Sequence, residues 1–227
     1  MTAAVFILGL VLSCGGDDGG SEEASGTTTS TTAASSTTST TTTTATNPST
    51  SSTLALGPLE AGEHSSAGFV PTMTFVADDG WQVAEDSPRV FALQRGPGAG
   101  LVFLHVQSVV APGSSEAEPP PADLVGWLRE HPALTVGPAQ SGEVGGRPAT
   151  LLDIELRRGE ATQKRGCADA CIELFRDGIG GVIVTEGIPG RVWVAGDIVI
   201  LADAPTAALA DHLAATEELL ATVQFAG

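Results

Sequence analysis

The stretch LVFLHVQSVV, residues 101–110, decides the fold, because nearly every one of its positions is apolar. A strand with one solvated face alternates apolar and polar residues, whereas a strand buried on both faces does not. We therefore expect this stretch to form a central strand that is covered on both faces. A glycine-rich link at 96–100 joins it to the apolar run 89–93, which predicts a hairpin or meander.

Shorter strand-like runs lie on both sides of this central strand. Towards the N-terminus, an Asp-Asp-Gly turn at 78–80 separates the runs 72–76 and 81–83. Further along the chain, a Gly-Asp pair at 196–197 joins two apolar runs, which is typical of a hairpin. The strands expected after the central one are 137–142, 149–156, 181–185, 191–195 and 197–201.

Two segments have the apolar spacing of helices. A stripe of leucine and tryptophan predicts a helix at about 121–131, which Pro132 ends. A second helix is expected at about 205–223, with Asp203 and Pro205 suited to its start. The order of the elements predicts an α+β fold, an antiparallel sheet of about seven to nine strands with two packed helices.

The first residues have the pattern of an export signal. The apolar run 3–12 is well short of the roughly 20 residues that a membrane-spanning helix needs. The sequence Val11-Leu12-Ser13-Cys14 resembles the lipobox of bacterial lipoproteins. The resemblance implies that Cys14 carries the lipid, that cleavage falls after Ser13, and that this lipid holds the protein at the extracytoplasmic face of the cell membrane.

Two features depart from that pattern. Leu12 is bulkier than the residue that the family usually carries there, and no Lys or Arg precedes the apolar run. We therefore expect Met1 to be an internal start, with a basic leader upstream. The alternative is a fortuitously apolar N-terminus with a free Cys14.

The sequence predicts three segments: a lipoprotein signal segment at 1–13, a stalk at 14–53 and one globular domain at 54–227. The stalk is dominated by Ser and Thr and has almost no large apolar residue, so we expect it to be disordered. It is either an O-glycosylated stalk or an inert low-complexity spacer.

The order of elements in the domain resembles the Mog1/PsbP-like fold. The sequence FVADDGW at 75–81 and the closing TVQF at 222–225 carry the resemblance, which extends over 54–227. The chain is also similar to uncharacterised secreted lipoproteins of actinobacteria. Neither resemblance implies any catalytic residue.

Charge narrows the classes of partner. The formal net charge is −17, and −13 of it belongs to 54–227, which holds all ten Lys and Arg residues against 23 acidic residues. Such a surface argues against nucleic acid and against docking on anionic lipid, and it is compatible with cationic partners. We expect a monomer that binds an unknown envelope protein or small ligand.

Two cysteines remain once Cys14 is assigned to the lipid. Cys167 and Cys171 form an even pair in an oxidising compartment, which predicts a disulfide. The alternative is a metal or redox centre, for which Asp169 is the only neighbouring candidate ligand. We expect no metal and no cofactor.

The sequence has no catalytic constellation. The four histidines do not share metal-ligand spacing, no serine lies in a G-x-S-x-G elbow, and several acid pairs cannot be placed in one cleft. We expect His105 to be a core histidine bonded to backbone, and His212 to lie on the polar side of the last helix.

Five residues are candidates for binding. Trp81 follows the Asp-Asp-Gly turn and is the best surface candidate among three tryptophans, although core packing is the alternative for all three. Arg157, Arg158, Lys164 and Arg165 form a local basic cluster, which is either an anion or partner site or a solvated loop.

The leading hypothesis is a lipid-anchored, non-catalytic binding or adaptor module at the cell envelope. The alternatives are an envelope-acting hydrolase that uses carboxylates and a structural or assembly factor of the envelope.

Overall fold

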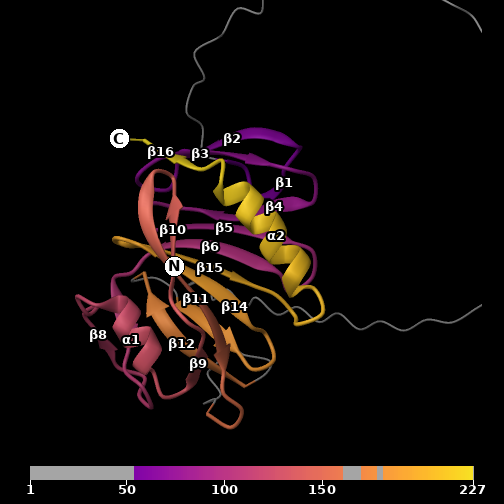
Figure 1. The fold of residues 1–227 in the computed structure, drawn as a ribbon. Coiled ribbons are helices and arrows are strands. Elements are labelled where there is room, and N and C mark those ends of the chain that lie inside the picture. Colours follow the sequence, from indigo (N-terminus) through magenta and orange to yellow (C-terminus); the bar gives the residue numbers. More distant parts are fainter. Residues whose placement is uncertain (1–53, 161–169, 178–180, 227) are drawn as a thin grey trace, which may run out of the picture. The chain divides into compact units, whose positions relative to one another are not determined.

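The computed structural model describes residues 54–160, 170–177 and 181–226 (Figure 1). The expected signal segment at 1–13 and stalk at 14–53 lie outside the described residues. The described residues form three antiparallel sheets and two helices, which confirms the α+β class.

The largest sheet has nine strands, and all of its pairs are antiparallel. Eight strands follow one path and the ninth, β9 (Leu134–Val136), pairs with the C-terminal end of β11. In spatial order the eight are β1 (Gly57–Pro58), β4 (Trp81–Asp86), β5 (Val90–Arg95), β6 (Gly100–His105), β15 (Ile198–Asp203), β14 (Gly190–Ala195), β11 (Arg147–Leu156) and β10 (Gln140–Val144).

Two smaller sheets and two helices complete the described fold. One sheet has the order β13 (Gly181–Thr185), β12 (Cys171–Arg176), β7 (Ser108–Val110) and β8 (Ala117–Glu118), and the other has β16 (Gln224–Phe225), β3 (Met73–Ala77) and β2 (Gly62–Ser66). The helices are α1 (Leu124–Glu130) and α2 (Leu209–Leu220), within the two expected segments. No helix in the described part of the chain is long and apolar enough to cross a membrane.

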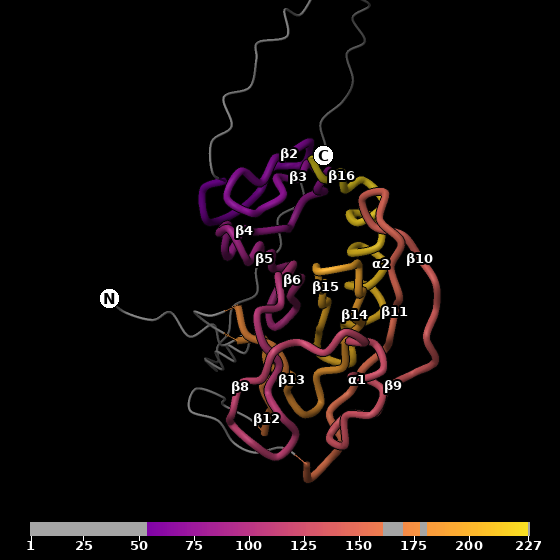
Figure 2. The backbone as a smooth tube through the Cα atoms, turned by 90° about the vertical axis from the view of Figure 1, so that its left-hand side faces the viewer, coloured from indigo at the N-terminus to yellow at the C-terminus, as the bar shows by residue number. Residues whose placement is uncertain are grey.

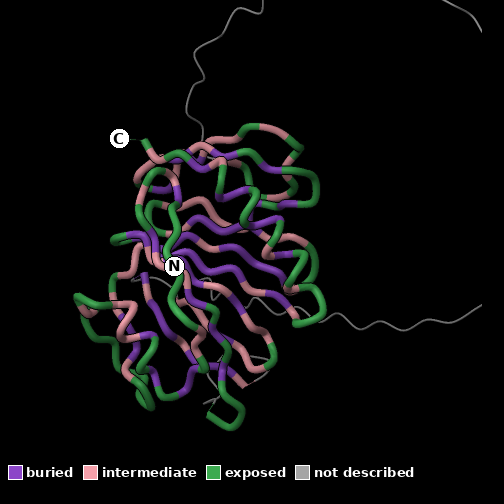
Figure 3. The backbone as a smooth tube through the Cα atoms, in the orientation of Figure 1, coloured by how far each residue is buried: buried purple, intermediate pink, exposed green. Residues whose placement is uncertain are grey.

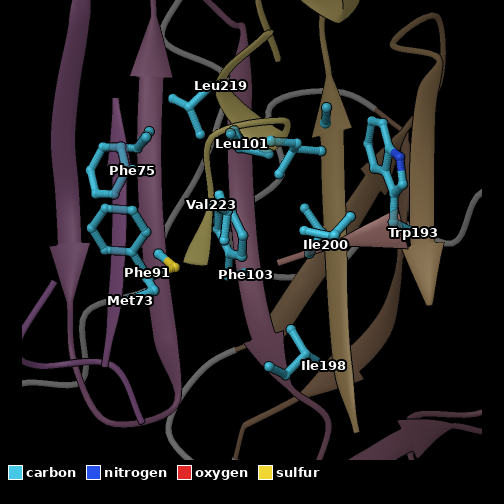
Figure 4. Packing of buried hydrophobic residues seen from close by; sticks show 14 of the residues in the cluster. Met73, Phe75, Phe91, Leu101, Phe103, Trp193, Ile198, Ile200, Leu219 and Val223 are labelled. Carbon is cyan, nitrogen blue, oxygen red and sulfur yellow. The ribbon is translucent and has the colours of Figure 1, made fainter. Parts of the chain in front are cut away.

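Side chains on both faces of the central strands are buried. In β15, Ile198 and Ile200 belong to one apolar cluster, whereas Val199 and Leu201 belong to the other. The first cluster includes residues of β3, β5 and α2, and Figure 4 shows Leu219 and Val223 among the labelled side chains of this cluster. The second includes residues of α1 and β12. Figure 2 shows α2 and β12 on different sides of the central strands, and Figure 3 shows the buried positions along them.

The stretch 101–110 does not form the single central strand that its sequence predicts. Its first half is part of β6, which lies between β5 and β15 and is covered on both faces as predicted. The chain then leaves this sheet, and the amide of exposed Gln107 donates to the carbonyl of Arg176 at 2.9 Å. The second half forms β7 in another sheet, so one apolar run contributes strands to two sheets.

Three other expectations need correction. The run 137–142 is not one strand, because Pro138 has no N–H for the ladder and residues 137–139 separate β9 from β10. Asp203 ends β15 rather than preparing a helix, since α2 begins only at Leu209. The strand β12 directly after the cysteines was not predicted. The hairpin at 196–197 is confirmed, with Ala195 opposite Ile198.

Candidate functional site

A groove of about 490 Å³ lies where the start of α1 faces the turn between β14 and β15. Three separate parts of the chain line it: the residue after β6, the segment that enters α1, and the β14–β15 hairpin. Its lining residues are Val106, Pro120, Pro121, Ala122, Asp123, Leu124, Val125, Val194, Gly196 and Asp197.

The α1 wall of the groove is held by a helix cap. Asp123 is the N-cap residue, and its Oδ1 accepts the amide N–H of Gly126 at 2.8 Å. A carboxylate at this position satisfies an N–H that the helix leaves without a partner and carries a favourable charge for the helix dipole. Pro120 and Pro121 hold the preceding backbone extended, and the fully buried Leu128 anchors the helix in the core.

The opposite wall is the tip of a tight hairpin. Gly196 has a φ of +67°, a left-handed conformation that glycine adopts without steric cost, and the turn exposes Asp197 to solvent. The side chain of Asp197 is 72% exposed, so this carboxylate is accessible from the groove.

Asp197 also contacts two basic side chains on its other neighbours. Its Oδ2 lies 3.2 Å from Nδ1 of His105, at the end of β6, and its Oδ1 lies 3.5 Å from a terminal nitrogen of Arg147, at the start of β11. The guanidinium of Arg147 lies over the ring of Phe225, 4.7 Å from its centroid. These contacts tie the hairpin tip to β6 and to β11.

The second nitrogen of His105 is engaged as well. Nε2 makes a hydrogen bond with the carbonyl oxygen of Val70, and the ring stacks on Phe69 with centroids 5.1 Å apart. The expected bond to backbone is therefore present, although the side chain is 16% exposed rather than fully buried. With both nitrogens occupied, this ring has no free nitrogen with which to activate a nucleophile in the groove.

Trp81 is not a surface residue, which corrects the sequence-based expectation. It is fully buried in the core, and its indole N–H donates to Oδ1 of Asp78 at 2.9 Å. The other carboxylate oxygen of Asp78 contacts Arg95 at 3.2 Å, and that guanidinium lies over the indole at 5.8 Å. The polar turn before the tryptophan thus caps a buried ring.

The predicted basic cluster is only partly described. Arg157 and Arg158 are exposed just after β11, and Arg157 donates to the carbonyl of Pro132 at 3.0 Å. Lys164 and Arg165 lie outside the described residues. Neither described arginine lines the groove.

The predicted modification sites also lie largely outside the described residues. Ser13, Cys14 and Cys167 belong to parts that the structure does not describe. Cys171 is fully buried as the first residue of β12. The predicted disulfide therefore remains a prediction.

His212 is buried inside the molecule rather than on the polar side of α2. Its Nε2 lies 2.8 Å from the carbonyl oxygen of Gly100, and its ring lies 5.7 Å from that of Trp81. Desolvation lowers its pKa; the hydrogen bond to Gly100 opposes this shift and the charge of Arg95 adds to it. Burial likewise lowers the pKa of His131.

Among the described residues, two carboxyl groups have raised pKa values, and neither lines the groove. Desolvation raises the pKa of Asp203 to about 7, against the lowering effect of hydrogen bonds from its own backbone N–H and that of Gly100. Desolvation also raises the pKa of Glu85; a hydrogen bond from Ser87 opposes the shift and the charge of Asp177 adds to it. Within the described ranges, no group of three metal-ligating side chains is present.

The groove itself was missed by sequence reasoning. Its two carboxylates, Asp123 and Asp197, are 74 positions apart, and each has a local explanation as a helix cap or a turn residue. The only available signal was the pairing of Pro119–Pro121 with a capped helix. No family model matches the chain, and a comparison with curated proteins found no match.

Proposed function

We propose that the protein is a lipid-anchored, non-catalytic binding module on the extracytoplasmic face of the cell membrane, with its ligand site in the groove between α1 and the β14–β15 turn. The observation that carries the proposal is the composition of the groove: mostly apolar walls, two carboxylates and a volume of about 490 Å³. Sites for small molecules have this combination of apolar lining, few polar groups and size.

The anchor rests on the similarity of Val11–Cys14 to a lipobox. Two or three acyl chains on Cys14 hold a protein stably on a membrane, whereas a single chain binds only marginally. The Ser- and Thr-rich segment 14–53 then acts as the spacer between the lipid and the binding domain.

The arrangement of acids favours binding over hydrolysis. A carboxylate-based hydrolase needs one carboxyl group that holds a proton and donates it to the leaving group. Asp197 lies between Arg147 and His105, and Asp123 accepts a backbone N–H. Both groove carboxylates are thus placed as hydrogen-bond acceptors.

The anchor is tested by the intact mass of the native protein purified from membranes. The expected mass begins at an acylated Cys14, and reduction should add two hydrogens for the Cys167–Cys171 disulfide. A Cys14→Ser variant should appear in the medium instead of the membrane. An unprocessed chain that keeps Met1 and carries no lipid would refute the anchor.

The ligand site is tested with the full chain carrying Cys14→Ser, so that no lipid or detergent competes. A set of small cationic, neutral and anionic compounds is screened by the amide chemical shifts of Ala122, Val125 and Gly196. Ala122→Trp fills the groove from an exposed position and should abolish the shifts, whereas Ala207→Trp, exposed outside the groove, should not. If no compound of any charge perturbs the groove, the proposal fails.

A further inference from the structure

We infer that the groove takes a small organic cation, an ammonium or guanidinium group on an apolar stem. This inference rests on the proposed function, since it names the ligand class of the same site.

The charges that line the groove are of one sign. Asp123 and Asp197 lie on its two walls, and none of the described residues that line it is basic. Each carboxylate uses only part of its acceptor capacity, because a carboxylate has about four lone-pair sites. Asp123 accepts from Gly126, and Asp197 has two contacts at 3.2 and 3.5 Å.

The N-terminus of α1 and the two basic side chains that contact Asp197, His105 and Arg147, oppose this preference without removing it. The N-terminus of α1 carries a partial charge of about +0.5, which the full negative charge of Asp123 more than offsets. Arg147 shares Asp197, but its guanidinium also lies over Phe225. A long ion pair with a 72% exposed carboxylate is weak and leaves room for a second cation.

The walls select an organic ion over a metal ion. Val106, Leu124, Val125 and Val194 are hydrocarbon and offer no ligand atoms from their side chains. Calcium takes six to eight oxygen ligands, and two carboxylates on opposite walls are too few. The same apolar walls bury an alkyl or aryl stem favourably, at roughly 25 cal/mol per Å² removed from water.

The size favours a small molecule over a protein surface. A volume of about 490 Å³ lies within the range of small-molecule sites, roughly 300–1,000 Å³. A stable protein partner buries about 800 Å² on each side. The charge of −13 on residues 54–227 also attracts cations over a longer range than the two carboxylates alone.

The experiment compares three probes of equal length, n-hexylammonium, n-hexanol and n-hexanoate, on the full chain carrying Cys14→Ser. Binding is followed by amide shifts of Ala122 and Gly196. Hexylammonium should bind about four- to twenty-five-fold more tightly than hexanol, since it faces two carboxylates that each contribute about two- to fivefold. Hexanoate should not bind, and added salt should weaken the binding of hexylammonium.

Variants that remove one charge show which residues give the groove its preference for hexylammonium. Asp123→Asn keeps an oxygen for the helix cap, and Asp197→Asn keeps one for its neighbours, so both should fold. Each should weaken hexylammonium about two- to fivefold and leave hexanol unchanged. Arg147→Gln should strengthen hexylammonium, and Glu218→Gln, an exposed acid on α2 outside the groove, should change nothing.

The outcomes separate the inference from the proposed function. If hexanol or hexanoate binds in the groove as well as hexylammonium, the cation assignment is wrong while the binding module stands. Binding of a basic peptide but of no free ammonium compound also overturns the small-ligand assignment. If none of the probes and none of the screened compounds binds, both the inference and the proposed function fail.

Discussion

Nδ1 of His105 lies 3.2 Å from Oδ2 of Asp197, which joins the end of β6 to the tip of the β14–β15 hairpin. The same ring reaches Val70 through Nε2 and stacks on Phe69. One side chain therefore links the loop after β2, a central strand and a wall of the groove.

Replacing His105 with alanine should destabilise the fold by about 1–3 kcal/mol, because it removes the bond to Val70 and the stacking on Phe69. Asp197→Ala should cost at most about 1 kcal/mol, since its ion pairs are solvent-exposed. Urea unfolding measures both. Equal losses would mean that the ion pair, and not the buried side of the ring, supplies the stability.

Asp86→Ala should be among the most destabilising single changes at a polar residue. It should lower the free energy of unfolding by about 3 kcal/mol. Its carboxylate accepts the amide of Leu54 at 3.1 Å, the hydroxyl of Ser66 at 2.5 Å and the amide of Phe69 at 3.1 Å. Asp79→Ala, at an exposed turn, should stay within about 0.5 kcal/mol. Denaturant midpoints compare the two variants, and similar midpoints would contradict the role given to Asp86.

Asp203 should make stability fall as the pH rises. Its folded-state pKa is raised from 3.8 to about 7, so between these values the folded protein holds a proton that the unfolded chain has released. The stabilising contribution of the protonated Asp203 is fully present below pH 3.8. It decreases between pH 3.8 and about pH 7, by at most about 1.4 kcal/mol per pH unit. Asp203→Asn should remove this slope and stabilise the protein at pH 8. An unchanged profile of unfolding free energy against pH would refute the prediction.

His212 should have the opposite effect on stability, which should fall as the pH falls. Its pKa is lowered from 6.5 in the fold, so the unfolded chain binds a proton first as the pH falls. Stability from the neutral ring is present above pH 6.5 and is lost below it. His212→Gln should reduce the loss between pH 6.5 and 5, most clearly in an Asp203→Asn background. Thermal midpoints across this range are the measurement, and His64→Gln, at a partly exposed histidine, is the control. A loss of the same size in both variants would contradict the prediction.

Local patterns predicted much of the secondary structure. The alternation of apolar residues at 149–156 corresponds to β11, in which Leu152, Ile154 and Leu156 are buried and the residues between them are exposed. The Gly-Asp pair at 196–197 correctly indicated a hairpin. Both signals depend only on residues that are close in sequence, so they can be read without knowledge of the partners.

The errors arose where distant parts of the chain decide the outcome. Trp81 follows a polar turn and so suggested a surface aromatic, yet strand pairing buries it beneath Arg95. The stretch 101–110 is apolar at nearly every position, and nothing local records that its second half pairs with β12 instead of continuing in the large sheet.

The sequence by itself determined the α+β class, the two helices and most of the strands, because apolar periodicity and turn residues are local properties. It also supplied the prediction of a lipid anchor at Cys14. The tertiary structure alone decided that Val106, Asp123 and Asp197 line one groove. The physical reason is that such proximity depends on which strands pair and where the chain crosses between sheets, and long-range packing sets both.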